Sequence, residues 1–261
     1  MTQKAIVIFD IDGVVRDVSG SYRRAIADTV EYFTNAAYRP TPLDIDQLKS
    51  EGVWNNDWEA SQELIYRHFT GRGQSREQLQ LDYNAIVAFF QSRYRGTDPD
   101  NFTGYICHEP LLLQASYLEQ LTQAGIAWGF FSGATRASAN YVLEKRLGLK
   151  SPALIAMEDA PGKPDPTGLF ATVQKLENDL DELSVILYVG DTVADMYTVV
   201  KAREINPHRT WIGVGVLPPH VQETATRRDV YAETLLTAGA AIVLSNVEEL
   251  NPVKIQKIVL S

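Results

Sequence analysis

Short runs of hydrophobic residues recur along the chain, and within each run nearly every position is apolar rather than every second one. The runs cover residues 5–9, 126–131, 154–156, 185–189, 211–216 and 241–244. Such continuous hydrophobicity is typical of strands that are buried on both faces, as in a parallel sheet. Helical patterns separate the later runs, over residues 111–124, 137–147, 167–180 and 193–205. This alternation predicts an α/β domain with a doubly wound parallel sheet.

The segment from about residue 21 to residue 95 breaks this alternation and carries consecutive helical patterns. These patterns cover residues 21–34, 43–51, 58–69 and 76–95, with proline, asparagine and glycine breaks between them. Residues 96–104 have the composition of a return linker. We therefore predict a Rossmann-like core made of residues 1–17 and 103–261, with an all-helical cap domain, residues 18–102, inserted into it.

Composition narrows the classes of function. The chain has 261 residues, 45% of them hydrophobic, which is enough for a substantial core. A formal net charge of -9 argues against non-specific binding to nucleic acid or to an anionic membrane. Cys107 is the single cysteine, so neither a disulfide framework nor a cysteine zinc site is expected. No run approaches the roughly 18 apolar residues of a membrane span, and the N-terminal run is too short for a signal peptide, so we predict a soluble cytoplasmic protein.

Two aspartates follow the first apolar run, one residue apart and directly before a glycine. In open α/β sheets ligands bind outside the carboxyl ends of the strands. Asp10 and Asp12 would start on the same side of an extended chain, where paired carboxylates can hold a divalent metal or act as acid, base or nucleophile. The alternative is a strand that ends in an Asx-type turn.

Three later strand ends also carry polar residues. Ser132 and Gly133 open a helical pattern and could bind a phosphate oxygen, although this motif taken alone favours the alternative that Ser132 simply caps that helix. Lys163 lies between a glycine and a proline, either as a constrained cation or as a surface lysine in a turn. Asp191 and Asp195 lie one helical turn apart after a glycine. The alternative for them is a helix N-cap followed by an acidic first turn.

Taken together and in this order, the four strand-end motifs resemble those of the haloacid dehalogenase superfamily, over nearly the full length of the chain. The helical insertion is similar to the C1-type cap of subfamily IA, and no single characterised protein is recognised. The resemblance implies a Mg²⁺-dependent phosphatase that hydrolyses a small phosphate monoester through an aspartyl-phosphate. An aspartate at position 12 is what phosphatases and phosphomutases of the superfamily carry, whereas its dehalogenases lack it and its ion-pumping ATPases carry threonine.

The resemblance also implies roles for the core residues. Asp10 would be the nucleophile that attacks phosphorus. Asp12 would protonate the leaving alkoxide and then activate the water that hydrolyses the intermediate. Ser132, Gly133 and Lys163 would bind the phosphoryl group and neutralise its charge.

The metal site implied by the resemblance draws on the same strand ends. Asp10, Asp191 and the main-chain carbonyl of Asp12 would hold Mg²⁺. Asp195 would orient either Lys163 or a metal-bound water. A cation is needed there because an anionic nucleophile cannot readily approach an anionic phosphate.

The cap of this family closes over the site, which implies a small phosphorylated metabolite as substrate. Five residues are candidates for reading it: Arg16, Tyr22, Trp54, Asn55 and Asn56. Arg16 could supply a second anion site, and the loop around residues 54–56 could hydrogen-bond and stack on a hydroxylated substrate. Alternatively, Asn56 caps the next helix and the tryptophans pack the cap core.

Two other functions remain open at this level. A sugar-phosphate mutase of the same superfamily would need the same core residues, and a catalytically silent binding module would need none of them. We expect no nucleic-acid or membrane partner. The sequence determines neither the metabolite nor the oligomeric state.

Overall fold

The computed structural model describes residues 5–54, 56–98, 101–177 and 184–260. The chain divides into two compact units, which we call the core (Met1–Asp17 and Pro110–Ser261) and the cap (Val18–Glu109). The core resumes at Pro110 rather than at the expected residue 103. The reason is a 3₁₀ turn, Tyr105–His108, which packs on the cap helices and whose tyrosine hydroxyl donates a 2.6 Å hydrogen bond to Asp28.

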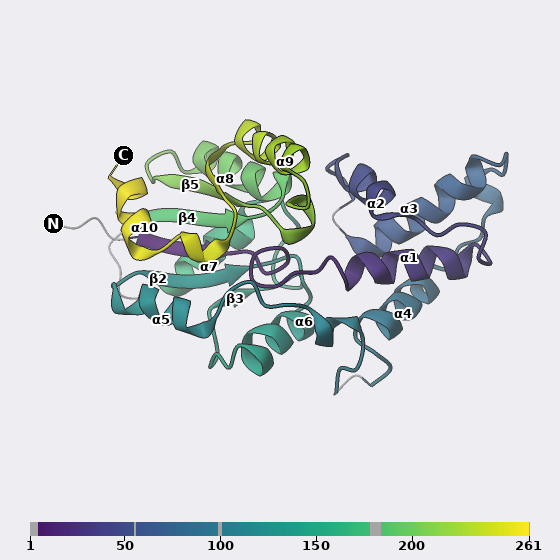
Figure 1. Cartoon of the computed structure of the whole chain (residues 1–261), viewed down its shortest axis with the longest axis horizontal. Helices are drawn as coiled ribbons and strands as arrows, with labels where there is room; N and C mark the ends of the chain where they lie inside the picture. Colours follow the sequence, from purple (N-terminus) through teal and green to yellow (C-terminus); the bar gives the residue numbers. More distant parts are fainter. Residues whose placement is uncertain (1–4, 55, 99–100, 178–183, 261) are drawn as a thin grey trace. The chain divides into compact units, whose positions relative to one another are not determined.

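The core is built on a parallel sheet, as the continuous apolar runs predicted. Its strands are β1 (Ala5–Phe9), β2 (Ala127–Phe131), β3 (Leu154–Ile155), β4 (Val185–Gly190), β5 (Trp211–Val216) and β6 (Ala240–Leu244). They lie in the order β3-β2-β1-β4-β5-β6, and every neighbouring pair is parallel. β1 is buried at each position and occupies the interior of the sheet between β2 and β4 (Figure 1). The carboxyl end of β1 is therefore flanked by the ends of two other strands.

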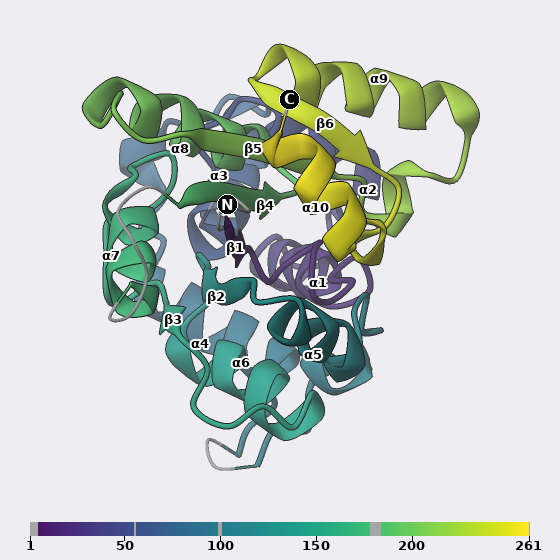
Figure 2. The ribbon, with the colours of Figure 1, turned by 90° about the vertical axis from the view of Figure 1, so that its left-hand side faces the viewer.

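Helices cover both faces of this sheet, which confirms the doubly wound α/β fold (Figure 2). The side chains of β1 alternate between the faces, because successive residues of a strand point to opposite sides. Val7 and Phe9 pack towards α5 (Ala115–Gln123), α6 (Arg136–Asn140) and α10 (Pro252–Val259). Ile6 and Ile8 pack towards α7 (Thr167–Leu176) and α8 (Val193–Ile205).

Some helix boundaries differ from the predicted ones. α6 is continued by a π-helical segment, Tyr141–Arg146, and residues 178–180 of the predicted helix 167–180 lie outside the described residues. α9 (Ala225–Thr237) and α10 were not predicted. Of the residues of α9, Leu235 alone is buried. Because the rest of the helix is more exposed, its sequence shows only a weak helical periodicity of hydrophobic residues.

The chain leaves the core and returns to it at one place. The amide of Asp17 donates to the carbonyl of Pro110 at 2.8 Å, and the amide of Leu112 donates to the carbonyl of Val15 at 2.8 Å. Between these bonds Arg16 and Leu111 form an antiparallel backbone bridge. The exit and return segments are thus paired like two short strands.

The cap contains α1 (Tyr22–Phe33), α2 (Pro42–Lys49), α3 (Asp57–Thr70) and α4 (Tyr83–Tyr94), with α1 packed on both α3 and α4. The predicted helix 76–95 is split, because a 3₁₀ turn occupies Arg76–Gln78 and Asp82 caps a new helix by accepting from the amide of Asn84 at 2.9 Å. Along the part of the chain described here, no helix has the length and apolar content needed to cross a membrane.

Candidate active site

Asp10 lies one residue beyond β1 and is buried, with 6% of its surface exposed. Its amide donates to the carbonyl of Val189 at 2.8 Å, which fixes it to the end of β4. Its Oδ1 accepts from the amide of Ile11 at 2.7 Å, and its Oδ2 lies 2.8 Å from Nζ of Lys163. Both carboxylate oxygens are therefore held in place at the carboxyl edge of the sheet.

Lys163 is enclosed by carboxylates and aromatic rings. Its Nζ lies 2.8 Å from Oδ2 of Asp10 and 2.6 Å from Oδ1 of Asp195, and 5.4 Å from the ring centroids of both Phe131 and Tyr188. The side chain of Lys163 is nearly buried, so the alternative of a surface lysine in a turn is wrong. Burial alone would lower the pKa of Lys163, but Asp10 and Asp195 raise the pKa above its usual value, so the side chain stays a cation.

Asp195 has hydrogen-bond partners for both carboxylate oxygens. Oδ1 contacts Lys163, while Oδ2 accepts from the amide of Thr192 at 2.9 Å and from its hydroxyl at 2.6 Å. Thr192, and not Asp191, is the N-cap of α8, and the two residues Thr192 and Asp195 form a capping box. The geometry matches an orienting contact with Lys163, and the alternative partner, a metal-bound water, stays a prediction.

Asp191 follows β4 and is buried beside a glycine turn. Oxygens of Asp10, Asp191 and Asp195 all lie within 4.8 Å of one another. Gly13 has a φ of +76°, and a Cβ atom built on it would lie 2.0 Å from Oδ2 of Asp191. The Asp191 carboxylate therefore occupies the space that any side chain at position 13 would need.

The electrostatics of this cluster favour a bound cation. Burial raises the pKa of Asp10 from 3.8 to about 6, with Lys163 opposing the shift and Asp195 and Asp12 adding to it. Burial also raises the pKa of Asp191 well above its usual value, and the neighbouring Asp195 and Asp10 raise it further. Hard carboxylate oxygens that crowd together in this way suit a small divalent cation such as Mg²⁺. The residues present thus fit a metal site.

Asp12 has a different environment from Asp10. Its side chain is 33% exposed, and its Oδ1 lies 2.6 Å from both Nε and Nη2 of Arg16. The guanidinium of Arg16 has no exposed surface. The structure thus brings Arg16 to Asp12, and the predicted contact of Arg16 with substrate stays a prediction.

Ser132 and Gly133 follow β2, next to the strand that carries Asp10. The amide of Ser132 donates to the carbonyl of Ile155 at 3.0 Å, and its Oγ accepts from the amide of Ala134 at 3.2 Å. Thr135 is the N-cap of α6, so the capping alternative for Ser132 is wrong. A Cβ atom on Gly133 would meet nothing within 4 Å, and the phosphate-binding role of both residues stays a prediction.

In the loop before α3, Trp54 and Asn56 form hydrogen bonds to other residues of the cap. Nε1 of Trp54 donates to Glu51 at 2.8 Å. Asn56 caps α3, since its Oδ1 accepts from the amide of Trp58 at 2.9 Å. Asn55 lies outside the described residues. The capping alternative for Asn56 is therefore confirmed, and substrate contacts by Trp54, Asn55 and Asn56 stay predictions.

Tyr22 begins α1 and lies among charged side chains of the cap. Nζ of Lys49 and the guanidinium of Arg23 each lie 5.6 Å from the centroid of its ring. Arg23 is nearly buried and forms an ion pair with Asp46. Substrate reading by Tyr22 stays a prediction.

Tyr188 was not among the predicted site residues. It lies within β4 with 1% of its surface exposed, and its hydroxyl is 3.1 Å from both Oδ1 of Asp195 and the carbonyl of Phe131. The available signal was a phenol inside an otherwise aliphatic strand, because a buried tyrosine hydroxyl needs a partner. Tyr188 supports the carboxylate that holds Lys163.

Replacing Tyr188 by phenylalanine is expected to lower the free energy of unfolding by about 1–2 kcal/mol and to reduce turnover severalfold, because Asp195 loses a donor and Lys163 becomes less well fixed. Chemical denaturation and steady-state kinetics measure the two effects. The matched control is Tyr117→Phe, since that buried hydroxyl donates to the carbonyl of Leu250 at 3.0 Å and touches no site residue. Equal activity loss in both variants would contradict a role for Tyr188 at the site.

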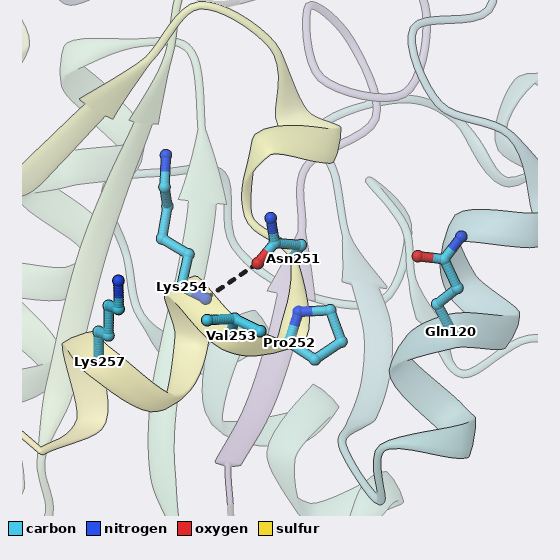
Figure 3. A pocket seen from close by; sticks show the side chains of 6 residues that line it. All are labelled: Gln120, Asn251, Pro252, Val253, Lys254 and Lys257. Carbon is cyan, nitrogen blue, oxygen red and sulfur yellow. Dashed lines mark hydrogen bonds between the residues drawn. The ribbon is translucent and has the colours of Figure 1, made fainter.

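A separate hollow of the core lies between α5 and α10 and has a volume of about 580 Å³ (Figure 3). Its lining residues are Gln120, Asn251, Pro252, Val253, Lys254 and Lys257. The side chain of Asn251 is used to cap α10, accepting from the amide of Lys254 at 3.0 Å. This lining carries no carboxylate, so the acidic strand ends remain the candidate active site.

The core thus brings a buried aspartate, a buried lysine and clustered carboxylates together at the carboxyl ends of its parallel strands. The chain belongs to the haloacid dehalogenase-like hydrolases, whose family model matches residues 4–202. This confirms the resemblance drawn from the strand-end motifs.

Solved structures show the same fold at low sequence identity. The phosphatase Tt82 from Thermococcus thioreducens is 24% identical, with a TM-score of 0.64 over 80% of this chain and 92% of that one. A phosphonoacetaldehyde hydrolase-like protein from Oleispira antarctica is 16% identical, with a TM-score of 0.69 over 98% and 94% of the two chains. A candidate β-phosphoglucomutase from Thermotoga maritima is 16% identical, with a TM-score of 0.56 over 98% of each chain.

One curated relative has a different kind of name. An imidazoleglycerol-phosphate dehydratase from Phytophthora nicotianae is 29% identical over 246 residues, which are 92% of this chain and 50% of that protein. The chain thus spans about half the length of this relative.

Proposed function

We propose that this protein is a Mg²⁺-dependent phosphatase acting on a small phosphate monoester. The observation that carries the proposal is the arrangement of Asp10, held between the Ile11 amide and Lys163, with the Asp191 carboxylate nearby. A buried carboxylate next to a fixed cation can attack an anionic phosphate whose charge is neutralised at the same place.

The reaction has two steps in this proposal. An oxygen of Asp10 forms a bond to phosphorus while the bond from phosphorus to the leaving oxygen breaks, and Asp12 gives its proton to the departing alkoxide. Water then attacks the aspartyl-phosphate, gives a proton to Asp12, and breaks the bond between phosphorus and Asp10. Lys163 balances charge on the phosphoryl oxygens in both steps. The products are an alcohol and inorganic phosphate.

The metal in this proposal is held by Asp10, Asp191 and the main-chain carbonyl of Asp12. When bound, Mg²⁺ would supply positive charge to the phosphoryl oxygens and to the carboxylate cluster. Asp195 is less suited as a direct ligand, because both of its oxygens already accept from Lys163 and Thr192.

The substrate proposed is a small phosphorylated metabolite in the cytoplasm. The name of the Phytophthora nicotianae relative suggests one chemical class, since imidazoleglycerol phosphate is a phosphate monoester of an imidazole-bearing alcohol. A metabolite panel with Mg²⁺ should therefore include imidazole-bearing phosphate monoesters beside sugar and glycerol phosphates. Release of inorganic phosphate from at least one member, absent in Asp10→Asn, is the expected result.

A sugar-phosphate mutase is the second candidate, favoured by the similarity to the Thermotoga maritima protein. The two functions differ in their product. Incubation with a sugar 1-phosphate, followed by product analysis, separates them. An isomerised sugar phosphate without release of free phosphate would favour the mutase and overturn the phosphatase proposal.

Thermal stability is expected to depend jointly on Mg²⁺ and pH. Because the pKa of Asp10 is raised from 3.8 to about 6 on folding, its contribution to stability is full below pH 3.8 and is lost as the pH rises through about 6. A bound cation favours the ionised form and reverses this trend. Adding Mg²⁺ should therefore raise the melting temperature by several degrees near about pH 7.5 and much less near about pH 5.

Two aspartate variants distinguish Mg²⁺ binding at the candidate site from Mg²⁺ binding at exposed carboxylates. Asp191→Asn should abolish the Mg²⁺-dependent shift, whereas Asp229→Asn should keep it, because Asp229 is exposed and pairs with Arg228 at 2.9 Å. Scanning calorimetry at matched ionic strength gives the measurement. A shift of equal size at both pH values would argue against metal binding by ionised Asp10.

A further inference from the structure

Arg16 is the largest side chain that is completely buried among the described residues. Its Nε and Nη2 both lie 2.6 Å from Oδ1 of Asp12. Burying a guanidinium is unfavourable unless it is paired, so a wholly covered arginine normally has a specific partner. The partner of Arg16 is Asp12, the carboxylate that acts as acid and base in the proposed reaction. Arg16 itself takes part in neither step of that reaction.

Backbone hydrogen bonds hold Arg16 in place on both sides. Its amide donates to the carbonyl of Ile11 at 3.2 Å, and its carbonyl accepts from the amide of Gly13 at 2.9 Å. It also bridges Leu111 on the return segment. The turn that carries Asp12 is thus closed by the residue that contacts the Asp12 side chain.

Asp12 is not immobilised by burial in the way that Asp10 is. The side chain of Asp12 is 33% exposed, compared with 8% for Asp10. An exposed aspartate can change rotamer, and a general acid must lie within hydrogen-bond reach of the atom it serves. The contacts from Arg16 hold one oxygen of Asp12 and restrict that freedom.

We propose that Arg16 is a positioning residue, which anchors Oδ1 of Asp12 so that the other carboxyl oxygen is presented to the leaving group and then to the attacking water. This role rests on the proposed phosphatase function.

Leaving-group dependence tests the proposal. The para-nitrophenolate ion leaves without protonation, whereas the alkoxide of an alkyl phosphate needs a proton from Asp12. Arg16→Gln should lower kcat on an alkyl phosphate such as glycerol phosphate about 30-fold, and kcat on para-nitrophenyl phosphate only about threefold. Arg16→Lys, which keeps one charged donor, should recover part of the loss on the alkyl phosphate.

Two further variants show whether Arg16 acts through Asp12. In an Asp12→Asn background, Arg16→Gln should cause less than about a twofold further loss on the alkyl phosphate, because coupled residues are not additive. The matched control is Arg209→Gln. Arg209 is also nearly buried, but its Nε donates to the carbonyl of Ser184 at 3.2 Å, just before β4, so its loss should leave the ratio of the two kcat values unchanged.

Each outcome decides the proposal. Equal losses on both phosphates, or full additivity with Asp12→Asn, would overturn it while leaving the phosphatase assignment intact. If the wild-type protein hydrolyses neither phosphate with Mg²⁺, the proposed function fails instead. Crystal structures then test positioning directly: a displaced or multiply oriented Asp12 carboxylate in Arg16→Gln supports the proposal, and an unchanged Asp12 contradicts it.

Discussion

Replacing Asp10 by asparagine is expected to lower phosphate release by about 10⁴-fold or more. A carboxamide is a poor nucleophile and cannot form the aspartyl-phosphate. The variant also removes the negative charge that lies 2.8 Å from Nζ of Lys163 and that would help to hold the proposed metal. Release of para-nitrophenolate in the presence of Mg²⁺ gives the measurement.

The fold of this variant should survive, because the change is nearly isosteric and Lys163 keeps its 2.6 Å ion pair with Asp195. Circular dichroism and thermal melting check this. Asp229→Asn makes the same chemical change at an exposed position and should retain wild-type turnover. Hydrolysis by Asp10→Asn at more than about one hundredth of the wild-type rate would contradict the assignment of Asp10 as nucleophile.

Gly13→Ala is expected to reduce turnover by about 10²-fold or more and to destabilise the fold by about 1–3 kcal/mol. Position 13 has a φ of +76°, which L side chains rarely adopt. The new methyl group would also lie 2.0 Å from Oδ2 of Asp191, so the carboxylate must move. In the proposed function Asp191 holds the metal, and displacing it by about 1 Å would misalign a reacting phosphate.

Gly125→Ala separates the two effects. Gly125 has nearly the same backbone conformation, with a φ of +73°, but a Cβ atom there would meet nothing within 4 Å. That variant should lose only the about 1–2 kcal/mol associated with the left-handed conformation and should keep its activity. If both variants lose activity alike, backbone strain rather than the contact with Asp191 explains the result. Denaturant unfolding and steady-state kinetics on both proteins provide the comparison.

The sequence predicted the sheet well, because a strand buried on both faces leaves a strong local signal. The run at residues 5–9 coincides with β1, and the run at 211–216 coincides with β5. α9 left no comparable signal, since most of its surface faces solvent. The split before α4 was also missed, because the capping contact of Asp82 that restarts the helix lies within an otherwise helical pattern.

In the candidate site, too, residues marked by their local sequence could be predicted, whereas those that depend on distant segments could not. Asp10, Lys163, Asp191 and Asp195 could be selected because each follows a strand or its loop, and the structure brings their charged groups together. Tyr188 could not be selected in this way, since its role depends on Asp195 meeting it from the following helix. The burial of Arg16 depends on the return segment around Leu111, which is distant in sequence.

The paired exit and return segments have a consequence for how this chain could be rebuilt. Because the amide of Asp17 bonds the carbonyl of Pro110 at 2.8 Å, the two ends of the inserted segment meet on the core itself. The entropic cost of closing a loop grows only slowly with its length, so we expect the core to tolerate inserts of very different size at this junction. We therefore expect the parallel sheet of the core to form even when the helical insert is replaced by a short turn or by a foreign domain.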